Sequence, residues 1–533
     1  MSSYCSGKDT LIGAASDDAC SDVTGTESPA TSPKLKPPLS ELQLIEEIEE
    51  GEESPDETTD IEALALIPSP GPSKYKGVED ISRRSYLSGI AYLVRYSYPV
   101  VASYLLQASI PATSNYFLSH LGSSELDAAA LGNTFASVTG WSLCLGMATS
   151  LDTLCSQTFT GGGSITRVGT QLQRGLLVSF AMLVPILILW WNIEVIMKHF
   201  IDASLVENSS LYLRVLILGA PAYSGFECVK KFLQAQGIMS ASTCILLLAS
   251  PINLIFNYLL VSNPKTSLGF VGAPLAQVLT LWLMFIFSIL YVCFINGKQA
   301  WGGWSRDCLR GWSAVIKLGL PGMGMICADW WAFEIILVAA SRLGKTPLTA
   351  HTIMGTISMI NYMAFHGLGI ATSCLIGNYL GQGNYKAARK IARCSVLLSI
   401  LMSLVTSAFL FTFRHSVANF ATSDAPVAEV LISFLPLVCM NQLIDGLATT
   451  DAGILRGQGR QRIGAVVYII GFYLLGIPLG LFLTFYANMG LLGLWIGIST
   501  SLLFIGLTLT FFIFITNWQQ QVLACRERLN HTK

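Results

Sequence analysis

Ionisable side chains lie deep inside apolar stretches in the second half of this 533-residue sequence. Asp329 and Glu334 share one stretch, and His366 and Asp445 lie in two others. A charge inside a membrane is costly, so an ionisable group there usually has a function. A carboxyl in such a place can carry a proton and, when ionised, can attract an organic cation instead. We therefore predict that these acids exchange protons for a second cation, with Asp329 as the main carrier.

Aromatic residues near these acids supply the other half of a candidate cation pocket. Trp330 and Tyr362 are the leading candidates for cation–π and stacking contacts, and three more aromatic residues accompany them: Trp331, Phe333 and Phe365. The alternative is that these residues are packing or interfacial anchors. Two roles also stay open for His366, which are proton relay and simple helix packing.

Three further acids have a structural explanation. Glu227 precedes Lys230 by three residues, a spacing at which a local ion pair forms on a helix. Asp152 lies at the end of its apolar stretch, and Asp451 is close enough in sequence to Arg456 to pair with it. We interpret these acids as structural, and we keep Glu227 only as a secondary coupling candidate.

The elements that position these residues follow from composition. Hydrophobic residues make up 52% of the chain and charged residues 12%, half of the roughly 25% charged residues of average soluble domains. About 20 helical residues cross the ~30 Å hydrocarbon core, and apolar stretches without period-two alternation predict helices rather than strands. Twelve such stretches lie near 96–119, 126–151, 171–195, 209–232, 241–262, 270–294, 314–341, 348–376, 391–413, 427–453, 463–485 and 489–516.

The two halves of the sequence repeat each other. Pro99 and Pro321 are 222 residues apart, and Gln236-Gly237 matches Gln458-Gly459 at the same offset. Each repeat holds six helices, so both copies have the same orientation. The fold class we expect is therefore an all-α polytopic membrane protein with two six-helix lobes related by a pseudo-twofold axis. In such transporters the substrate path runs between the halves.

The repeat also shows an asymmetry. The positions 222 residues before Asp329, Glu334 and Asp445 hold residues that are not carboxylic acids, namely Gln107, Ala112 and Tyr223. A shared scaffold would more often be duplicated. The deep acids of the second half therefore indicate a specialised cation site there.

Lysine and arginine predict the orientation, because cytosolic loops carry an excess of them. Fourteen lie in one set of loops and five in the other set. The richer set includes Lys230, Lys231 and Arg456, and we place it in the cytosol together with both termini. The expected segments are an acidic tail at 1–84, lobes at 85–297 and 314–516, a linker at 298–313 and a C-terminal tail at 517–533.

The stretch Leu320–Glu334 reads LPGMGMICADWWAFE and resembles the P…EWW[SA][FY]E signature of eukaryotic multidrug and toxic compound extrusion (MATE) transporters. One departure is Asp329, where the signature usually has Glu. Further stretches between residues 85 and 516 are similar to motifs of this family: Leu151–Gln157, Pro221–Tyr223, Lys231–Gly237, Gly377–Gly381, Asp445-Gly446 and Leu455–Gly459.

This resemblance implies twelve helices in two lobes around a central cleft. It implies export of organic cations and drug-like compounds in exchange for protons or sodium, normally protons in the eukaryotic branch. The essential acid of helix 7 falls on Asp329, the second acid on Glu334 and the acid of helix 10 on Asp445. Asn378 and Gln157 lie in matching stretches and join the candidate binding residues.

Other functions are kept open or excluded. A carrier of one metabolite, such as an organic acid or a flavonoid, is an alternative, and so is a lipid-linked flippase. An enzyme is not expected, since no catalytic His or Cys set is visible. None of the thirteen cysteines forms a CxxC pair, so we expect no metal and no cofactor.

The expected partners are organic cations, protons or sodium, and the lipid bilayer. Nucleic acid is not expected, because the sequence has no basic tract interleaved with aromatic residues. We expect a monomer. The stretch Glu62–Ile67 resembles an acidic dileucine sorting signal, which points to a vacuolar or lysosomal membrane, with the plasma membrane as the alternative.

Overall fold

The computed structural model describes residues 81–199 and 203–531, and the regular elements in this part of the chain are all helices. Residues 1–80, which make up nearly all of the predicted acidic tail and contain the sorting-like stretch, lie outside the described residues. All twelve apolar stretches of the sequence fall on helical segments. The all-helical prediction is therefore confirmed for the described residues.

The first half of the described chain runs from α3 to the π-helical turn η5. Its elements are α3 (Tyr86–Ser119), α4 (Ser123–Ala136), η1 (Ser137–Trp141), α5 (Ser142–Thr160), α6 (Arg167–Trp191), α7 (Ile193–Met197), α8 (Ala203–Leu216), η2 (Ile217–Gly219), α9 (Ala220–Ala235), α10 (Ala241–Asn257), η3 (Tyr258–Ser262), η4 (Gly269–Val271), α11 (Gly272–Leu290) and η5 (Tyr291–Ile295).

The second half runs from α12 to α20, after two short 3₁₀ turns, η6 (Lys298–Ala300) and η7 (Arg306–Leu309). Its elements are α12 (Trp312–Ser341), α13 (Lys345–Gly381), α14 (Tyr385–Thr412), α15 (Arg414–Ala421), α16 (Ala425–Gln458), α17 (Gln461–Ile469), η8 (Ile470–Gly476), α18 (Ile477–Leu481), η9 (Phe482–Tyr486), α19 (Leu491–Phe514) and α20 (Trp518–His531). The segment predicted as a C-terminal tail thus forms a helix, α20.

Nine helical segments in the described part are long and apolar enough to cross a membrane. They account for nine of the twelve predicted spans. The other three correspond to α3, to α4 with α5, and to α8 with α9, which are helical but fall outside this group. Membrane crossing by these three segments stays a prediction.

Local sequence explains where several helices begin and end. The hydroxyl of Ser85 accepts a hydrogen bond from the backbone N–H of Ser88 and caps the start of α3. The long helix α16 begins with Pro426 in its first turn and ends at Gly459, whose φ of 75° is left-handed. This is the usual arrangement of proline inside the start of a helix and glycine just after its end. The endpoint matters because α16 carries Asp445.

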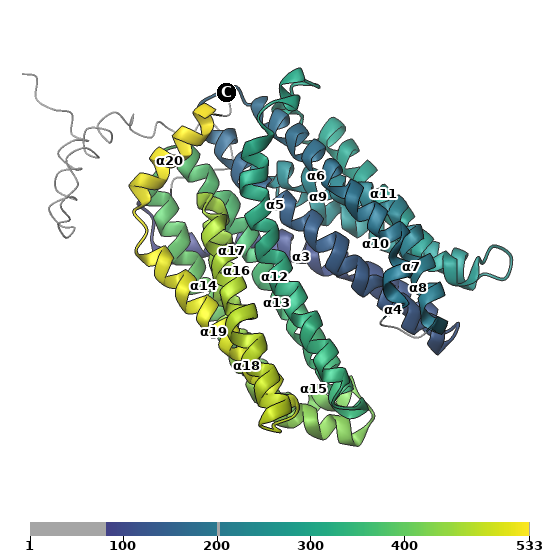
Figure 1. The fold of residues 1–533 in the computed structure, drawn as a ribbon. Coiled ribbons are helices and arrows are strands. Elements are labelled where there is room, and N and C mark those ends of the chain that lie inside the picture. Colours follow the sequence, from purple (N-terminus) through teal and green to yellow (C-terminus); the bar gives the residue numbers. More distant parts are fainter. Residues whose placement is uncertain (1–80, 200–202, 532–533) are drawn as a thin grey trace, which may run out of the picture. The chain divides into compact units, whose positions relative to one another are not determined.

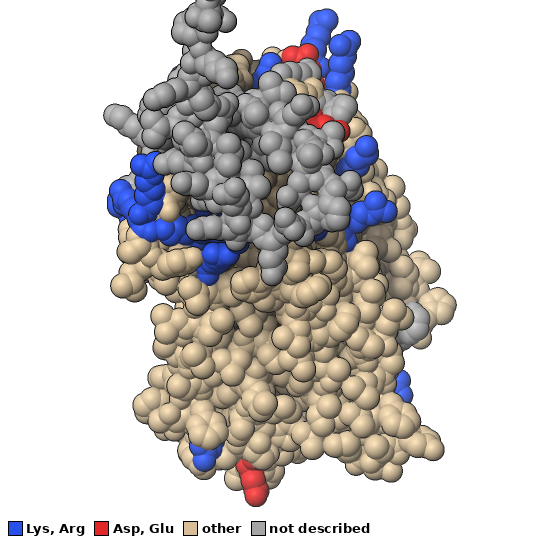
Figure 2. Space-filling view, turned by 90° about the vertical axis from the view of Figure 1, so that its left-hand side faces the viewer, with Lys and Arg blue, Asp and Glu red and all other residues tan. Residues whose placement is uncertain are grey.

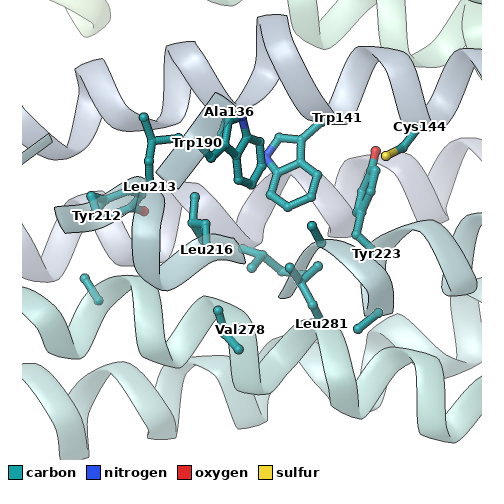
Figure 3. Packing of buried hydrophobic residues seen from close by; sticks show 14 of the residues in the cluster. Ala136, Trp141, Cys144, Trp190, Tyr212, Leu213, Leu216, Tyr223, Val278 and Leu281 are labelled. Carbon is teal, nitrogen blue, oxygen red and sulfur yellow. The ribbon is translucent and has the colours of Figure 1, made fainter. Parts of the chain in front are cut away.

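Large aromatic residues fill the core of the first half. Trp141 lies 5.3 Å from Trp190 in an edge-to-face arrangement and 4.6 Å from Tyr223, measured between ring centroids. Figure 3 shows these rings with Cys144 beside Tyr223. The indole N–H of Trp190 donates to the hydroxyl of Thr139 at 2.8 Å, so its one polar atom is satisfied. Tyr223, the repeat counterpart of Asp445, is therefore a packing residue.

The helices of the two halves pack side by side at one end of the described chain and separate toward the other end (Figure 1). The closest packing between them joins α12 to α5, and α13 to both α3 and α5. α20 lies at the end where they meet, and α15 and α18 lie at the opposite end. Lys and Arg side chains also gather at the end near α20 (Figure 2), and we call it the basic end.

Candidate functional site

The two deepest acids lie on different helices of the second half and face the same region. Asp329 is buried in α12, and Asp445 is half-buried in α16. Asp445 lies near enough for its charge to act on Asp329, although α12 and α16 do not pack extensively against each other. Asp329 is twelve residues before the end of α12, about 18 Å along the helix axis, and Asp445 is thirteen residues, about 20 Å, before the end of α16. Both acids therefore lie far from the helix ends. Since like charges repel, a proton or cation between them would relieve that repulsion.

An aromatic residue connects these acids to their neighbours. The hydroxyl of Tyr362 in α13 lies near Asp329, Asp445 and Trp330, and it is 3.4 Å from the Nδ1 atom of His366. The Tyr362 ring also stacks on His366, with centroids 5.4 Å apart and an angle of 24° between planes. The structure thus brings together five of the nine predicted site residues.

His366 lies at the boundary with the first half and connects the cluster to it. Its ring meets the ring of Tyr104 from α3 edge to face, with centroids 5.0 Å apart. Arg456 of α16 acts electrostatically on both rings. The Nε and Nη2 atoms of Arg456 are buried and have no hydrogen-bond partner among the described residues. Sequence analysis did not identify Tyr104 as a site residue and gave Arg456 only a structural role.

Glu334 lies apart from the acid pair. It is half-buried on α12, and neither Asp329 nor Asp445 is among the groups that act on it. α12 is helical throughout, so residues five apart point about 140° away from each other. Trp331 is also turned away from the cluster, since its indole N–H donates to the backbone carbonyl of Val138 in the first half at 2.8 Å.

The first half has a buried polar cluster of a different kind. Lys231 pairs with Asp152 at 3.0 Å, and Lys230 pairs with Glu227 at 2.6 Å, with all four side chains at most 1% exposed. Gln107 accepts from Lys230 and donates to Glu227. The predicted pairing of Glu227 with Lys230 is confirmed. Gln107 is the repeat counterpart of Asp329. In the first half, therefore, an amide that is hydrogen-bonded to an ion pair stands at the position that a carboxyl occupies in the second half.

Two expectations about charged residues were wrong. Lys230 and Lys231 were assigned to a cytosolic loop, but α9 continues to Ala235 and buries both. Their acidic partners neutralise them, and this attraction offsets part of the desolvation cost of burying the two ammonium groups. Asp451 was expected to pair with Arg456, but it accepts a hydrogen bond from the hydroxyl of Thr510 in α19 instead. Asp451 therefore still has a structural explanation, but its partner is Thr510 and not Arg456.

Hydrogen bonds join the two halves at the basic end. The amide of Gln157 in α5 donates to the carbonyl of Gly457 at 3.0 Å, and the hydroxyl of Thr160 donates to the carbonyl of Asn378 at 2.7 Å. The side-chain amide of Asn378 donates to the carbonyl of Ala235 at 3.1 Å. Asn378 is twelve residues from His366 along α13, about 18 Å. Gln157 and Asn378, both predicted site residues, therefore belong to the interface between the halves and not to the acid cluster.

The C-terminal helix α20 adds to this interface. Arg528 donates one hydrogen bond to the side chain of Gln157 at 2.8 Å and another to the carbonyl of Gln458 at 2.7 Å, so it contacts both halves. Burial lowers the pKa of Arg528 from its ordinary value. Trp518 and Val522 on the same helix are buried against the second half. Sequence analysis missed this helix.

Glycines allow the halves to approach closely at this interface. A Cβ on Gly146 would lie 2.4 Å from the backbone of Met323, and a Cβ on Gly377 would lie 2.7 Å from the Cβ of Ser156. Among the described residues, the hydrogen bond between the halves that lies farthest from the basic end is the one that Trp331 donates. Trp331 is ten residues, about 15 Å, before the end of α12. The halves are thus held together at the basic end.

Metal and thiol chemistry have no visible basis in the described residues. No group of three or more His, Cys, Asp or Glu side chains there is arranged to hold a metal ion. The described cysteines are free thiols. The site therefore consists of carboxyls, aromatic rings and a guanidinium, which suits the binding of protons and small charged solutes.

Comparison with known proteins identifies the family. A model of the MatE family matches residues 99–259 and, a second time, residues 321–482. The chain belongs to the MATE family of transporters. The double match agrees with the internal repeat of the sequence, and MATE proteins are transporters rather than enzymes. The resemblance of the α12 sequence to the MATE signature is confirmed by this assignment.

Several MATE proteins are similar to the chain over most of its length. Human multidrug and toxin extrusion protein 1 is 33% identical over 78% of this chain and 72% of its own. An uncharacterized transporter of Schizosaccharomyces pombe is 39% identical over 76% of this chain and 75% of its own. The crystal structure of the eukaryotic MATE transporter AtDTX14 superposes with a TM-score of 0.79 and 27% identity, covering 83% of this chain and 99% of that chain.

Proposed function

We propose that this MATE transporter is an antiporter that exports organic cations in exchange for protons. The observation that carries the proposal is the buried carboxyl of Asp329, which has Asp445 and the hydroxyl of Tyr362 near it. A proton and an organic cation compete for the same carboxyl pair, so binding of one releases the other. Tyr362 and Trp330 offer ring faces to an organic cation but not to a bare proton. The human relative is named a multidrug and toxin extrusion protein, which supports export of drug-like compounds.

The proposed roles differ among the predicted site residues. Asp329 and Asp445 bind the proton or the cation, Trp330 and Tyr362 contact the organic cation, and His366 links this site to Tyr104 of the first half. Glu334 affects transport through a step separate from cation binding. Gln157, Asn378 and Glu227 support the interface and the ion-paired cluster.

We also propose that the halves act as two lobes, residues 85–297 and 314–516, joined by the linker 298–313 and followed by 517–533. The basic end then faces the cytosol, with both termini there, since Lys and Arg favour cytosolic loops. The contacts at the basic end correspond to a state open to the opposite side of the membrane. Alternating access requires these contacts to break while others form at the far end. The vacuolar or lysosomal membrane and the plasma membrane both stay predictions.

Transport in liposomes tests the proposal. The purified protein is reconstituted, a pH gradient with an acidic lumen is imposed, and uptake of a labelled organic cation is followed. Wild type should show gradient-dependent uptake, and Asp329→Asn should lose it. Asp451→Asn is the matched control, because Asp451 is a buried acid of the same half that is held by Thr510, and it should retain uptake. Equal loss in both variants, or uptake driven only by a sodium gradient, would refute proton coupling at Asp329.

One observation favours a second candidate, a proton-coupled carrier of an organic anion. Arg456 is buried at the boundary between the halves, and two of its guanidinium nitrogens have no hydrogen-bond partner among the described residues. A substrate carboxylate would satisfy them with charge-assisted hydrogen bonds. Uptake of a labelled carboxylic acid by the same liposomes, lost in Arg456→Gln, would favour this candidate over the organic cation.

A further inference from the structure

A small cavity lies on the outer surface of the second half, between α14, α19 and α20. It is far from the acid cluster and plays no part in the proposed transport chemistry. Arginines of α14 line one part of it, and apolar residues of α14 and α19 line another, with the first residue of α20 between them: Arg389, Arg393, Val396, Ile513, Phe514 and Trp518. The lining is therefore basic on one side and apolar on the other.

The basic part carries two positive charges that have no acidic partner among the residues the structure describes. Arg389 and Arg393 are four residues apart on α14 and so lie on the same face of the helix. Both are exposed, and neither forms an ion pair with a described residue. Lys390, between them, is directed elsewhere and donates to the backbone carbonyl of Ser82 at 3.2 Å. Arg393 donates one hydrogen bond to the hydroxyl of Tyr86 at 3.4 Å, so its remaining N–H groups and the guanidinium of Arg389 can bind an external anion.

The apolar part extends from these charges toward the middle of the helices. Val396 is seven residues beyond Arg389, which is about 10 Å along α14. Phe514 is the last residue of α19, a helix apolar enough to span a membrane, and it is 63% exposed. Trp518 follows four residues later and lines the cavity, with its side chain otherwise buried against the second half. A soluble anion would use only the two arginines, whereas a lipid would use both parts.

The position of the cavity agrees with a lipid as its ligand. On the face of the molecule that carries α14, α19 and α20, Lys and Arg gather near one end and leave a broad uncharged surface below them (Figure 2). Arg389 and Arg393 lie in the first turns of α14, at that same end. A phosphate group at the membrane surface would reach them while its acyl chains lie against the uncharged surface.

We propose that Arg389, Arg393, Trp518 and the end of α19 form a binding site for the phosphate headgroup of an anionic phospholipid. The guanidinium groups hold the phosphate by charge-assisted hydrogen bonds, and the acyl chains lie along the exposed side chain of Phe514. Trp518 is the first residue of α20, and Arg528 of the same helix bonds both halves. An occupied site therefore stabilises α20 in its docked position and, with it, the closed basic end.

Lipid binding by the full-length protein tests this site. Purified transporter in detergent is titrated with phosphatidylglycerol or with the zwitterionic phosphatidylcholine, and bound lipid is counted by native mass spectrometry. Each arginine near an anionic lipid surface contributes about 1 kcal/mol, so Arg389→Gln/Arg393→Gln should bind phosphatidylglycerol about 30-fold more weakly. Wild type should prefer phosphatidylglycerol to phosphatidylcholine.

The matched control is Arg306→Gln/Arg310→Gln, which removes two exposed arginines from the segment between the halves. It changes the net charge equally and should bind phosphatidylglycerol like wild type. Equal lipid binding by all three proteins would overturn the proposal. So would displacement of the lipid by millimolar inorganic phosphate or glycerol phosphate, because that outcome describes a simple anion site without a role for the apolar part.

Discussion

The ion pair between Asp152 and Lys231 predicts a specific pattern of stability changes. Their charged atoms are 3.0 Å apart, and the side chains are 0% and 1% exposed. Asp152→Leu leaves a buried ammonium group without its counter-charge, which should cost about 3–5 kcal/mol of unfolding free energy. Lys231→Met leaves a buried carboxylate and should cost a similar amount. The double variant Asp152→Leu/Lys231→Met removes both charges and should recover most of that loss, since hydrophobic replacement of a buried pair is often neutral.

The assay is reversible unfolding in mixed micelles of increasing sodium dodecyl sulfate fraction, followed by circular dichroism, for wild type, both single variants and the double variant. The exposed pair of Lys198 and Glu194, with side chains 58% and 31% exposed, is the control. Lys198→Gln should cost less than about 1 kcal/mol. If the double variant loses as much as the two single variants together, the charges are not coupled and the argument from burial fails.

Three further changes have defined outcomes. Arg528→Ala removes two hydrogen bonds to the two halves, worth about 1.5–3 kcal/mol each, so hydrogen–deuterium exchange at the basic end should rise, and unchanged exchange would contradict the bridging role of α20. Gly453→Ala places a Cβ 2.3 Å from the carbonyl oxygen of Gly369 and should lower stability by about 1–3 kcal/mol, measured by size-exclusion chromatography after heating. Gly355→Ala, with open space around it, should lose no stability in the same assay. Asn488 has a φ of 56°, so Asn488→Gly should melt no lower than wild type, whereas Asn488→Val should melt lower because a branched side chain disfavours that backbone conformation.

Hydropathy was sufficient to locate the twelve long apolar helical segments because the bilayer imposes a length and composition that the sequence displays directly. It also located Asp329 and Asp445, since a carboxyl inside an apolar stretch is conspicuous. The separation of Glu334 from Asp329 followed from helical geometry alone. Periodicity could not show that α13 and α16 bring Tyr362 and Asp445 to the same place as Asp329, because that depends on how the helices pack.

The missed features have identifiable causes. Lys230 and Lys231 look like loop residues in a hydropathy profile, and only the position of Asp152, on another helix, explains their burial. For α20 the signal was present in the sequence: Trp518, Val522 and Cys525 recur at spacings of four and three, which is typical of an amphipathic helix. The glutamines between these positions and the charged residues that follow Cys525 lower the hydropathy of the segment, so a hydropathy profile does not show the helix.

The glycine-rich interface at the basic end has a consequence for the speed of transport. Where Gly146 meets Met323 and Gly377 meets Ser156, the backbones of the halves approach closely, and beside them Met147 of the first half packs against Val315 and Leu318 of the second. Separating the halves exposes these apolar side chains to water, and the hydrophobic penalty scales with the exposed area. Water can take over the hydrogen bonds of Gln157 and Thr160 as the halves part. The activation barrier for opening this end therefore comes mainly from the apolar contacts and less from the replaceable hydrogen bonds.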